Sequence, residues 1–317
     1  MIVVSGINSS VLKKLRSSVV TLGVFDGVHL AHRKIIKKTI QRARELGSKS
    51  VLLTFEKHPK RTTHKKAPPI LTTTTKKIAL LRELGPDVLV LINFNKKFAS
   101  LSAQSFIEKV LVKKFKAKEI IIGHDYGFGK GKEGNGALLK KEGEAFGFKT
   151  RVVSPLKING KRISSTVIRE VIRKGDILSA RKYLGHDYSV IGRVEGGKKI
   201  GRTFGFPTAN LNCFNEVVPK EGVYAVRIKM DGRWYNGACS ITSPTFDRPG
   251  KPTLNPEVFI FDFKKSIYHK VMELFFVKRI RDSRKFPDVP ALVAQIKRDI
   301  AKIKKILQKN IVGRNSI

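Results

Sequence analysis

The sequence has little cysteine, few acidic residues and no long apolar run. Two cysteines, Cys213 and Cys239, are too few for a disulfide framework or a cysteine-based zinc site. No stretch approaches the roughly 18 uncharged apolar residues that a membrane-spanning helix needs. The first dozen residues also lack the basic start of a signal peptide. These absences predict a cytoplasmic protein without a membrane partner.

Basic residues greatly outnumber acidic ones. Lysine and arginine total 64 against 25 aspartates and glutamates, which gives a formal net charge of +39. Such an excess indicates polyanionic partners: nucleic acid, an acidic membrane surface or phosphate-bearing substrates. The lysines are spread along the chain, in pairs such as Lys37-Lys38 and Lys304-Lys305, which is typical of a solvated surface rather than one binding patch. This dispersed charge disfavours nucleic acid as a partner.

The first half of the chain alternates between apolar runs and helical stretches. Residues 19–22, 51–55 and 87–94 are mostly apolar strand candidates, and 29–46 is a helical stretch that Gly47 ends. Continuous runs between amphipathic helices predict an α/β domain with a parallel sheet covered on both faces. Ligands of such sheets bind at the carboxyl ends of the strands.

The pattern changes after about residue 185. Short alternating strands such as 190–194 and 223–228, with turns rich in glycine, proline and aspartate, predict a small antiparallel β-barrel. A lysine-rich amphipathic helix follows over 288–308. With 317 residues, two domains are expected. We place them at 1–186 and 187–317.

Two histidines stand at the start of the first long helix. His29 and His32 are three residues apart, so both can lie on one face where free backbone N–H groups attract an anion. Two imidazole donors suit the charge that develops on an attacked α-phosphate. Gly23 and Gly27 would let a phosphate approach the backbone. Two alternatives stay open, a metal site without a third ligand at sensible spacing and surface histidines on an ordinary helix.

A hydroxyl-rich segment follows the last predicted strand of this domain. Ser164, Ser165 and Thr166 can cap a helix and donate to phosphates, and Arg169 can clamp β- and γ-phosphates. A plain helix cap with an exposed arginine is a common alternative. The histidine pair and this segment occur in order at the two ends of one alternating domain. That combination is much less common than either motif alone, and it favours nucleotidyl transfer.

The second half holds a glycine-rich stretch over 192–211. The chain has no Gly-x-x-x-x-Gly-Lys-Ser/Thr sequence, which disfavours a Walker-type ATPase. The glycines of this stretch can instead let a loop fold over a nucleotide. Thr208 and Asn210 offer neutral oxygens suited to a magnesium ion that bridges phosphates. The alternative is a β-hairpin with glycine turns.

Together these motifs resemble the bacterial bifunctional riboflavin kinase/FMN adenylyltransferase family, also called FAD synthetase. The resemblance extends from about Leu22 to the closing helix, and residues 54–59, 123–129 and 243–246 resemble further segments of the family. It implies a riboflavin kinase-like barrel that makes FMN from riboflavin and ATP. It also implies a Rossmann-like nucleotidyltransferase domain that transfers AMP from a second ATP to FMN, which gives FAD and diphosphate.

The resemblance also implies roles for individual residues. His29, His32 and Arg169 would act on the ATP phosphates, and Glu257 would take the proton from the ribityl 5′-hydroxyl. As an alternative, Glu257 is an ordinary acid at a strand edge. The remaining predicted residues are, for ATP and its phosphates, Gly23, Phe25, Asp26, Gly27, Ser164, Ser165, Thr166, Gly192, Gly196, Gly201 and Gly205; for flavin, Asp125, Phe128 and Arg281; and for Mg²⁺, Thr208 and Asn210.

The sequence departs from the family pattern at several positions. Ala31 replaces a glycine between the histidines, Phe259 stands where histidine is usual, and Ser283 replaces a glutamate. The glycine before the Pro-Thr-Phe segment is also missing. Because the metal-binding signature is intact, we expect both activities. The alternatives are an FMN adenylyltransferase with a degenerate kinase domain, or a basic nucleic-acid-binding protein on an enzyme-like fold, whose affinity would fall steeply with salt.

Overall fold

The computed structural model describes residues 1–63, 67–196, 200–242 and 254–312. It divides into two compact units, Met1–Ser165 and Thr166–Ile317, which are treated separately below. The predicted Pro-Thr-Phe segment, 243–246, and Gly197 of the glycine-rich stretch lie outside the described residues.

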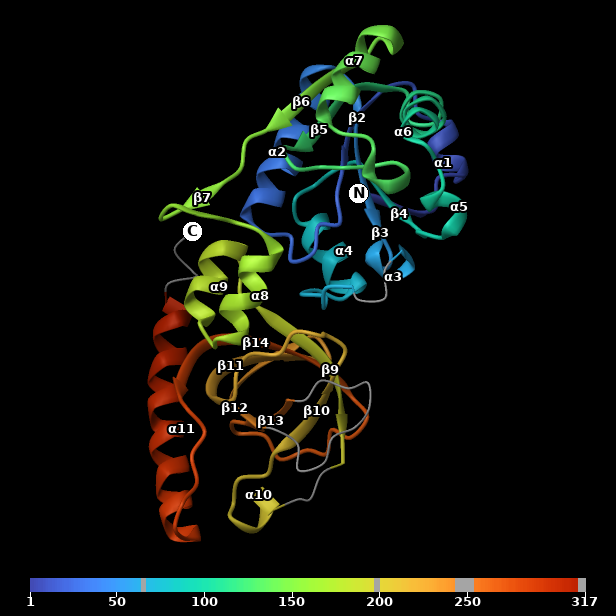
Figure 1. Ribbon diagram of the computed structural model, residues 1–317. Coiled ribbons are helices and arrows are strands. Elements are labelled where there is room, and N and C mark those ends of the chain that lie inside the picture. Colours follow the sequence, from blue (N-terminus) through green and yellow to red (C-terminus); the bar gives the residue numbers. More distant parts are fainter. Residues whose placement is uncertain (64–66, 197–199, 243–253, 313–317) are drawn as a thin grey trace. The chain divides into compact units, whose positions relative to one another are not determined.

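The first unit is built on a six-stranded parallel sheet (Figure 1). Its order is β1-β4-β3-β2-β5-β6, and each neighbouring pair is parallel. This confirms the α/β prediction. The strands are β1 (Ile2–Ser5), β2 (Ser18–Leu22), β3 (Lys49–Phe55), β4 (Val88–Ile92), β5 (Ala117–Gly123) and β6 (Lys149–Val153).

The central strands of this sheet are buried on both faces. Every residue of β2 and β4 is buried, as their mostly apolar sequences predict. Because successive side chains alternate between faces, Leu53 and Val90 belong to one core cluster, whereas Leu52 and Leu89 belong to another.

Helices and two short strands complete the first unit. The longest helix, α2 (Leu30–Glu45), begins at the N-cap His29. The other elements are α1 (Ser10–Lys13), α3 (Lys60–Thr63), α4 (Thr74–Arg82), α5 (Lys96–Ala99), α6 (Ala103–Phe106), the π-helix η1 (Ile107–Val112), the 3₁₀ helix η2 (Lys130–Lys132), α7 (Gly136–Phe146), β7 (Lys157–Ile158) and β8 (Lys161–Arg162).

The second unit contains a closed antiparallel barrel of order β10-β13-β12-β11-β14-β9, as predicted. Its strands are β9 (Ser189–Glu195), β10 (Ala209–Cys213), β11 (Gly222–Met230), β12 (Arg233–Thr242), β13 (Asn255–Ile260) and β14 (Val271–Arg281). Its helices are α8 (Ser165–Arg173), α9 (Ile177–Leu184), α10 (Ile200–Thr203) and α11 (Val289–Val312).

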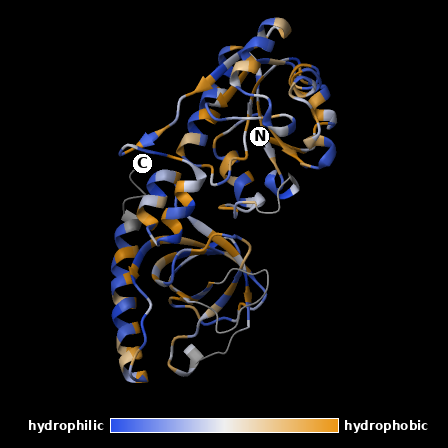
Figure 2. Ribbon diagram, in the orientation of Figure 1, coloured by the Kyte–Doolittle hydropathy of each residue, from blue (hydrophilic) through white to orange (hydrophobic). Residues whose placement is uncertain are grey.

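The C-terminal helix α11 covers part of the barrel. Polar and apolar positions are interspersed along it (Figure 2), and its apolar side places Ile303 and Leu307 against Ala225, Phe261 and Val277. Helix α9 packs against β14, so the helical stretch before residue 185 belongs to this compact unit. The domain boundary at 186 stays a prediction.

Candidate active sites

The loop between β2 and α2 has a strained backbone. Phe25 and Val28 have φ angles of 50° and 39°, and Gly27 has a φ of 83°. A side chain on Cβ makes this left-handed region costly, above all for a β-branched residue such as valine. Such conformations persist where the surroundings enforce them, and they cluster at functional sites.

Buried hydrogen bonds hold this loop in place. The carboxylate of Asp26 accepts hydrogen bonds from the backbone N–H groups of Leu71, at 3.0 Å, and Thr72, at 3.1 Å. The backbone N–H of Gly27 donates to the hydroxyl oxygen of Thr72 at 3.1 Å. A Cβ on Gly23 would lie 2.7 Å from the ring of Phe25. In this structure, then, these predicted phosphate-binding residues shape the loop.

The two predicted histidines lie together at the start of α2. Their rings stack with centroids 3.5 Å apart and planes 17° apart. Nδ1 of His29 accepts the backbone N–H of His32 at 3.4 Å, so the proton of a neutral His29 ring lies on Nε2. Burial, followed by the nearby His29 and Lys77, lowers the pKa of His32 well below its ordinary value. The helix start therefore presents the uncharged imidazole of His32 beside the first backbone N–H groups of α2.

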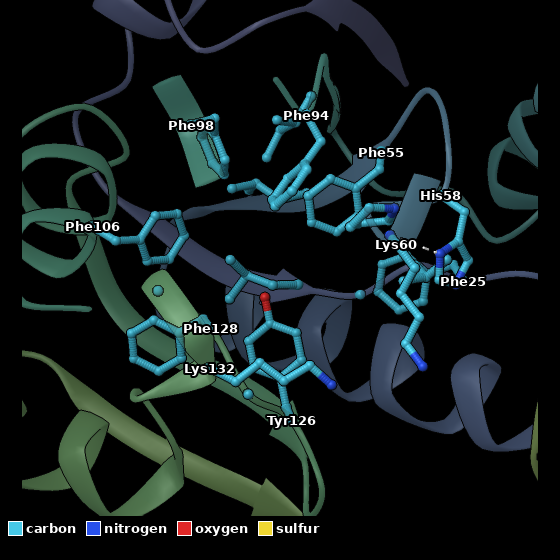
Figure 3. Close-up of a pocket in the computed structure, with 18 of the residues that line it drawn as sticks. Phe25, Phe55, His58, Lys60, Phe94, Phe98, Phe106, Tyr126, Phe128 and Lys132 are labelled. Atoms are coloured by element: carbon cyan, nitrogen blue, oxygen red, sulfur yellow. Dashed lines mark hydrogen bonds between the residues drawn. The ribbon is translucent and has the colours of Figure 1, made fainter. Parts of the chain in front are cut away.

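A cavity of about 690 Å³ opens beside this loop (Figure 3). Its lining includes the last residues of β2, β3 and β4. One of its walls is a continuous row of aromatic rings. Neighbouring centroids lie 5.5 Å apart for Phe55–Phe94, 5.7 Å for Phe94–Phe98, 6.0 Å for Phe98–Phe106 and 5.5 Å for Phe106–Phe128.

Polar groups are few in this cavity. The hydroxyl of Tyr126 points toward its middle (Figure 3), and burial raises the pKa of Tyr126, which keeps the hydroxyl protonated. His58, Lys60 and Lys132 also line the cavity. Asp125 lines it as well, and its carboxylate is held by Arg162 at 2.5 Å. The site thus combines an aromatic interior with several basic groups.

The cavity is lined by more residues than the sequence analysis assigned to a flavin site. Asp125 and Phe128 were predicted for flavin and do line it, and so do Gly23, Phe25 and His32, which were predicted for ATP. Phe94 was missed, and Phe55 and Tyr126 were named only within the family-like segments 54–59 and 123–129. The available signal was position, because Phe55 ends β3 and Phe94 follows β4, at the edge where ligands of parallel sheets bind.

The hydroxyl-rich segment is divided between the units. The hydroxyl of Ser165 donates to the backbone carbonyl of Asp26 at 2.9 Å, which ties this segment to the histidine loop. Ser164, which directly precedes α8, lies with Ser165 at the end of the first unit. Thr166 and Arg169 lie on α8 in the second unit, where Arg169 is buried.

The second candidate site lies on neighbouring strands of the barrel. Asn210 on β10 is directly opposite Glu257 on β13, and Thr208 precedes Asn210 by two residues. Residues paired across strands share a face, as do residues two apart. The oxygens of Asn210 and the carboxylate of Glu257 therefore lie on one face, and Thr208 directly precedes that strand. Burial raises the pKa of Glu257.

Two glycines of the glycine-rich stretch allow close backbone packing. A Cβ on Gly192 would lie 2.5 Å from the carbonyl oxygen of Asn212, and one on Gly201 would lie 2.4 Å from that of Phe206. Gly205 has a φ of 81°, and a Cβ on Gly196 would meet no atom within 4 Å. Gly196 and Gly205 are thus the two of these four glycines at which an added Cβ would meet open space.

Two further positions have clear partners. Phe259, where the sequence departs from the family, packs edge to face on Phe206 with centroids 5.7 Å apart. Nε of Arg281, a predicted flavin ligand, donates to Asp299 of α11 at 2.8 Å. In this structure Arg281 anchors α11 to the end of β14.

Comparison with known proteins identifies the family. The FAD synthetase family model matches residues 11–167, and the riboflavin kinase model matches residues 184–307. The bifunctional riboflavin kinase/FMN adenylyltransferase of Haemophilus influenzae is 36% identical over 293 residues, covering 90% of this chain and 93% of that protein. The chain belongs to this family. Its Bacillus subtilis member is 38% identical over 288 residues, or 89% of this chain and 90% of that one.

A solved structure shares the whole architecture. It is of a Streptococcus pneumoniae protein described as a macrolide-efflux protein, with a TM-score of 0.84 and 32% identity over 96% of this chain and 99% of that one. In the described part of our chain, no helix has both the length and the apolar character to cross a membrane. The predicted family and fold class are thus confirmed, with the FAD synthetase match first and the riboflavin kinase match second.

Proposed function

We propose that the second unit phosphorylates riboflavin to FMN with ATP, and that the first transfers AMP from another ATP to FMN, giving FAD and diphosphate. Family membership along the whole chain supports both reactions. The main structural support for adenylyl transfer to FMN is the aromatic cavity beside the stacked histidines.

The aromatic cavity suits the flavin of FMN. Its volume of about 690 Å³ falls within the usual range of about 300–1,000 Å³ for small-molecule sites. A flat isoalloxazine ring packs favourably on aromatic side chains. The phosphate of FMN would lie near the basic groups His58, Lys60 and Lys132, which also line the cavity. Asp125 and Phe128 would contact the flavin.

Adenylyl transfer needs charge stabilisation at the α-phosphate of ATP. A phosphate oxygen of FMN attacks the α-phosphorus, and the bond to the departing diphosphate breaks. His29 and His32 would donate N–H groups to the phosphate oxygens, together with the start of α2. From the family resemblance alone, Ser164, Ser165, Thr166 and Arg169 are proposed to complete the phosphate site.

Phosphoryl transfer in the barrel needs a base and a positioned ATP. Glu257 would accept the proton of the ribityl 5′-hydroxyl while that oxygen attacks the γ-phosphorus, and ADP leaves. Thr208 and Asn210 carry the hard oxygen donors that Mg²⁺ prefers. Asn210 is paired with Glu257 in the strand register, and Thr208 directly precedes the same strand. A bound Mg²⁺ would neutralise phosphate charge. Gly196 and Gly205 would lie in the loop over the nucleotide.

Small phosphorylated molecules are the partners that this proposal requires. Both reactions use ATP, which agrees with our proposal of a cytoplasmic location. The charge of +39 would attract these anionic substrates without a nucleic-acid ligand.

One assay tests the proposal. The purified chain is incubated with riboflavin and MgATP, and the flavin products are separated by chromatography. The wild type should form FMN and then FAD, whereas His32→Ala should form FMN alone, because only the first unit loses a phosphate donor. Loss of both products from a folded variant would contradict separate sites. If the wild type makes FAD only from supplied FMN, the kinase unit is inactive.

A further inference from the structure

A lysine is buried behind the histidine loop. Lys77, on α4, is 6% exposed. Its ammonium group donates to the backbone carbonyl of Phe55 at 2.6 Å and approaches that of Val24 at 3.5 Å. A second donor reaches the same place, since the hydroxyl of Thr54 donates to the Val24 carbonyl at 3.0 Å.

The two carbonyl groups belong to the two parts of the first candidate site. Phe55 ends β3, and Val24 belongs to the strained loop that leads to His29; both residues line the aromatic cavity. A shift of either segment would change the distance between a flavin phosphate in the cavity and an α-phosphate at the histidines. Lys77 therefore bridges the two segments whose separation the reaction depends on.

An apolar side chain could be buried at this position at a lower cost in free energy. Burying an ammonium group costs free energy, and that cost is offset here by the carbonyl oxygens it contacts and by nearby Asp26. The charge also reaches the histidines, since Lys77 helps to lower the pKa of His32. Lys77 thus acts on both the position of the loop and the charge state of the phosphate-binding pair.

We propose that Lys77 is a positioning residue for adenylyl transfer, which fixes the histidine loop against the strand end that lines the aromatic cavity. The inference rests on the proposed function of the first unit. It assigns Lys77 no contact with substrate, so the effect should appear mainly in the rate of the bound complex rather than in ATP affinity.

The titration of Lys77 provides a signature of this role. Burial lowers the pKa of Lys77 to about 8, against the opposing effect of Asp26. The ammonium form is therefore present below about pH 8 and is lost as the pH rises through that value. FAD formation should fall over the same range. Other titratable groups surround the ammonium group of Lys77. His32 is one of them. The others line a small cavity of about 140 Å³ together with Lys77: Asp26, Glu56, Lys57, His58 and Arg61.

The test compares full-length variants. Lys77→Met should lower kcat for FAD formation by about tenfold or more, because small misplacements of reacting groups are costly. Lys77→Met should also remove the fall in the rate of FAD formation above pH 8. Lys77→Arg should recover much of the rate and move the fall to higher pH, since guanidinium stays charged. Arg82→Met, an exposed position on the same helix, is the matched control and should resemble the wild type.

Two internal readouts make the result decisive. FMN formation by the second unit should be unchanged in every variant, and quenching of FMN fluorescence should report binding without turnover. A wild-type rate and pH profile in Lys77→Met would overturn the inference. If Lys77→Met does not fold, Lys77→Arg decides, and an unchanged alkaline fall in it would overturn the inference. A wild type that forms no FAD from FMN would instead refute the proposed function.

Discussion

Glu257 and His32 have opposite pKa shifts with the same physical cause. Burial disfavours charge, so it raises the pKa of the carboxyl group and lowers that of the imidazole. A base with a raised pKa accepts a proton more readily, and a neutral imidazole can enter a phosphate site without a buried charge. Both shifts suit the proposed roles at neutral pH.

The raised pKa of Glu257 gives a prediction for the kinase reaction. The base must be ionised, so FMN formation should fall as the pH drops through the pKa of Glu257, above the range of an ordinary glutamate. Glu257→Gln should lower kcat by about 100-fold or more and abolish this acid limb. FAD formation from supplied FMN is the control. An unchanged kinase rate in Glu257→Gln would exclude Glu257 as the base.

At the scale of elements, an ion pair attaches helix α11 to the barrel. The Arg281–Asp299 ion pair is largely buried, with side-chain exposures of 21% and 8%, and Gln295 donates to the other oxygen of Asp299 at 2.8 Å. Removing one partner of such a pair leaves the other poorly solvated.

Asp299→Ala should therefore destabilise the barrel by about 1–3 kcal/mol. Thermal unfolding of the full chain should show an earlier transition, together with faster thermal loss of FMN formation. Lys302→Ala, an exposed change on the same helix, is the control. Equal melting of the two variants would show that the ion pair adds no stability. A large rise in the KM for riboflavin in Arg281→Lys, without lower stability, would instead support the predicted flavin contact.

The sequence predicted the helices and strands better than it predicted the contacts between them. Apolar runs such as that of β4 predicted the parallel strands, because periodicity and burial are local properties. The row from Phe55 to Phe128 could not be predicted as a wall, because its members come from separate segments that only the fold brings together. Lys77 was missed for a related reason, since lysine is almost always exposed and its burial depends on distant carbonyl groups.

At the scale of the whole molecule, the charge of +39 is the main property that neither site explains. If it serves to capture anionic substrates, the field acts on encounter and not on the chemical step. Added salt screens such long-range attraction, with a Debye length of about 10 Å at 0.1 M ionic strength. We therefore expect kcat/KM for ATP to fall several-fold in both reactions between low and high salt, while kcat changes little.

The measurement is a salt titration of both rates, with sucrose as an uncharged control for viscosity and water activity. Duplex DNA should not inhibit either reaction at physiological salt, because the basic residues are dispersed along the chain. Tight DNA binding with a steep dependence on salt would instead favour the nucleic-acid alternative. A salt-independent kcat/KM would show that substrate capture depends on contacts within each site, and that the excess charge belongs to the solvated surface alone.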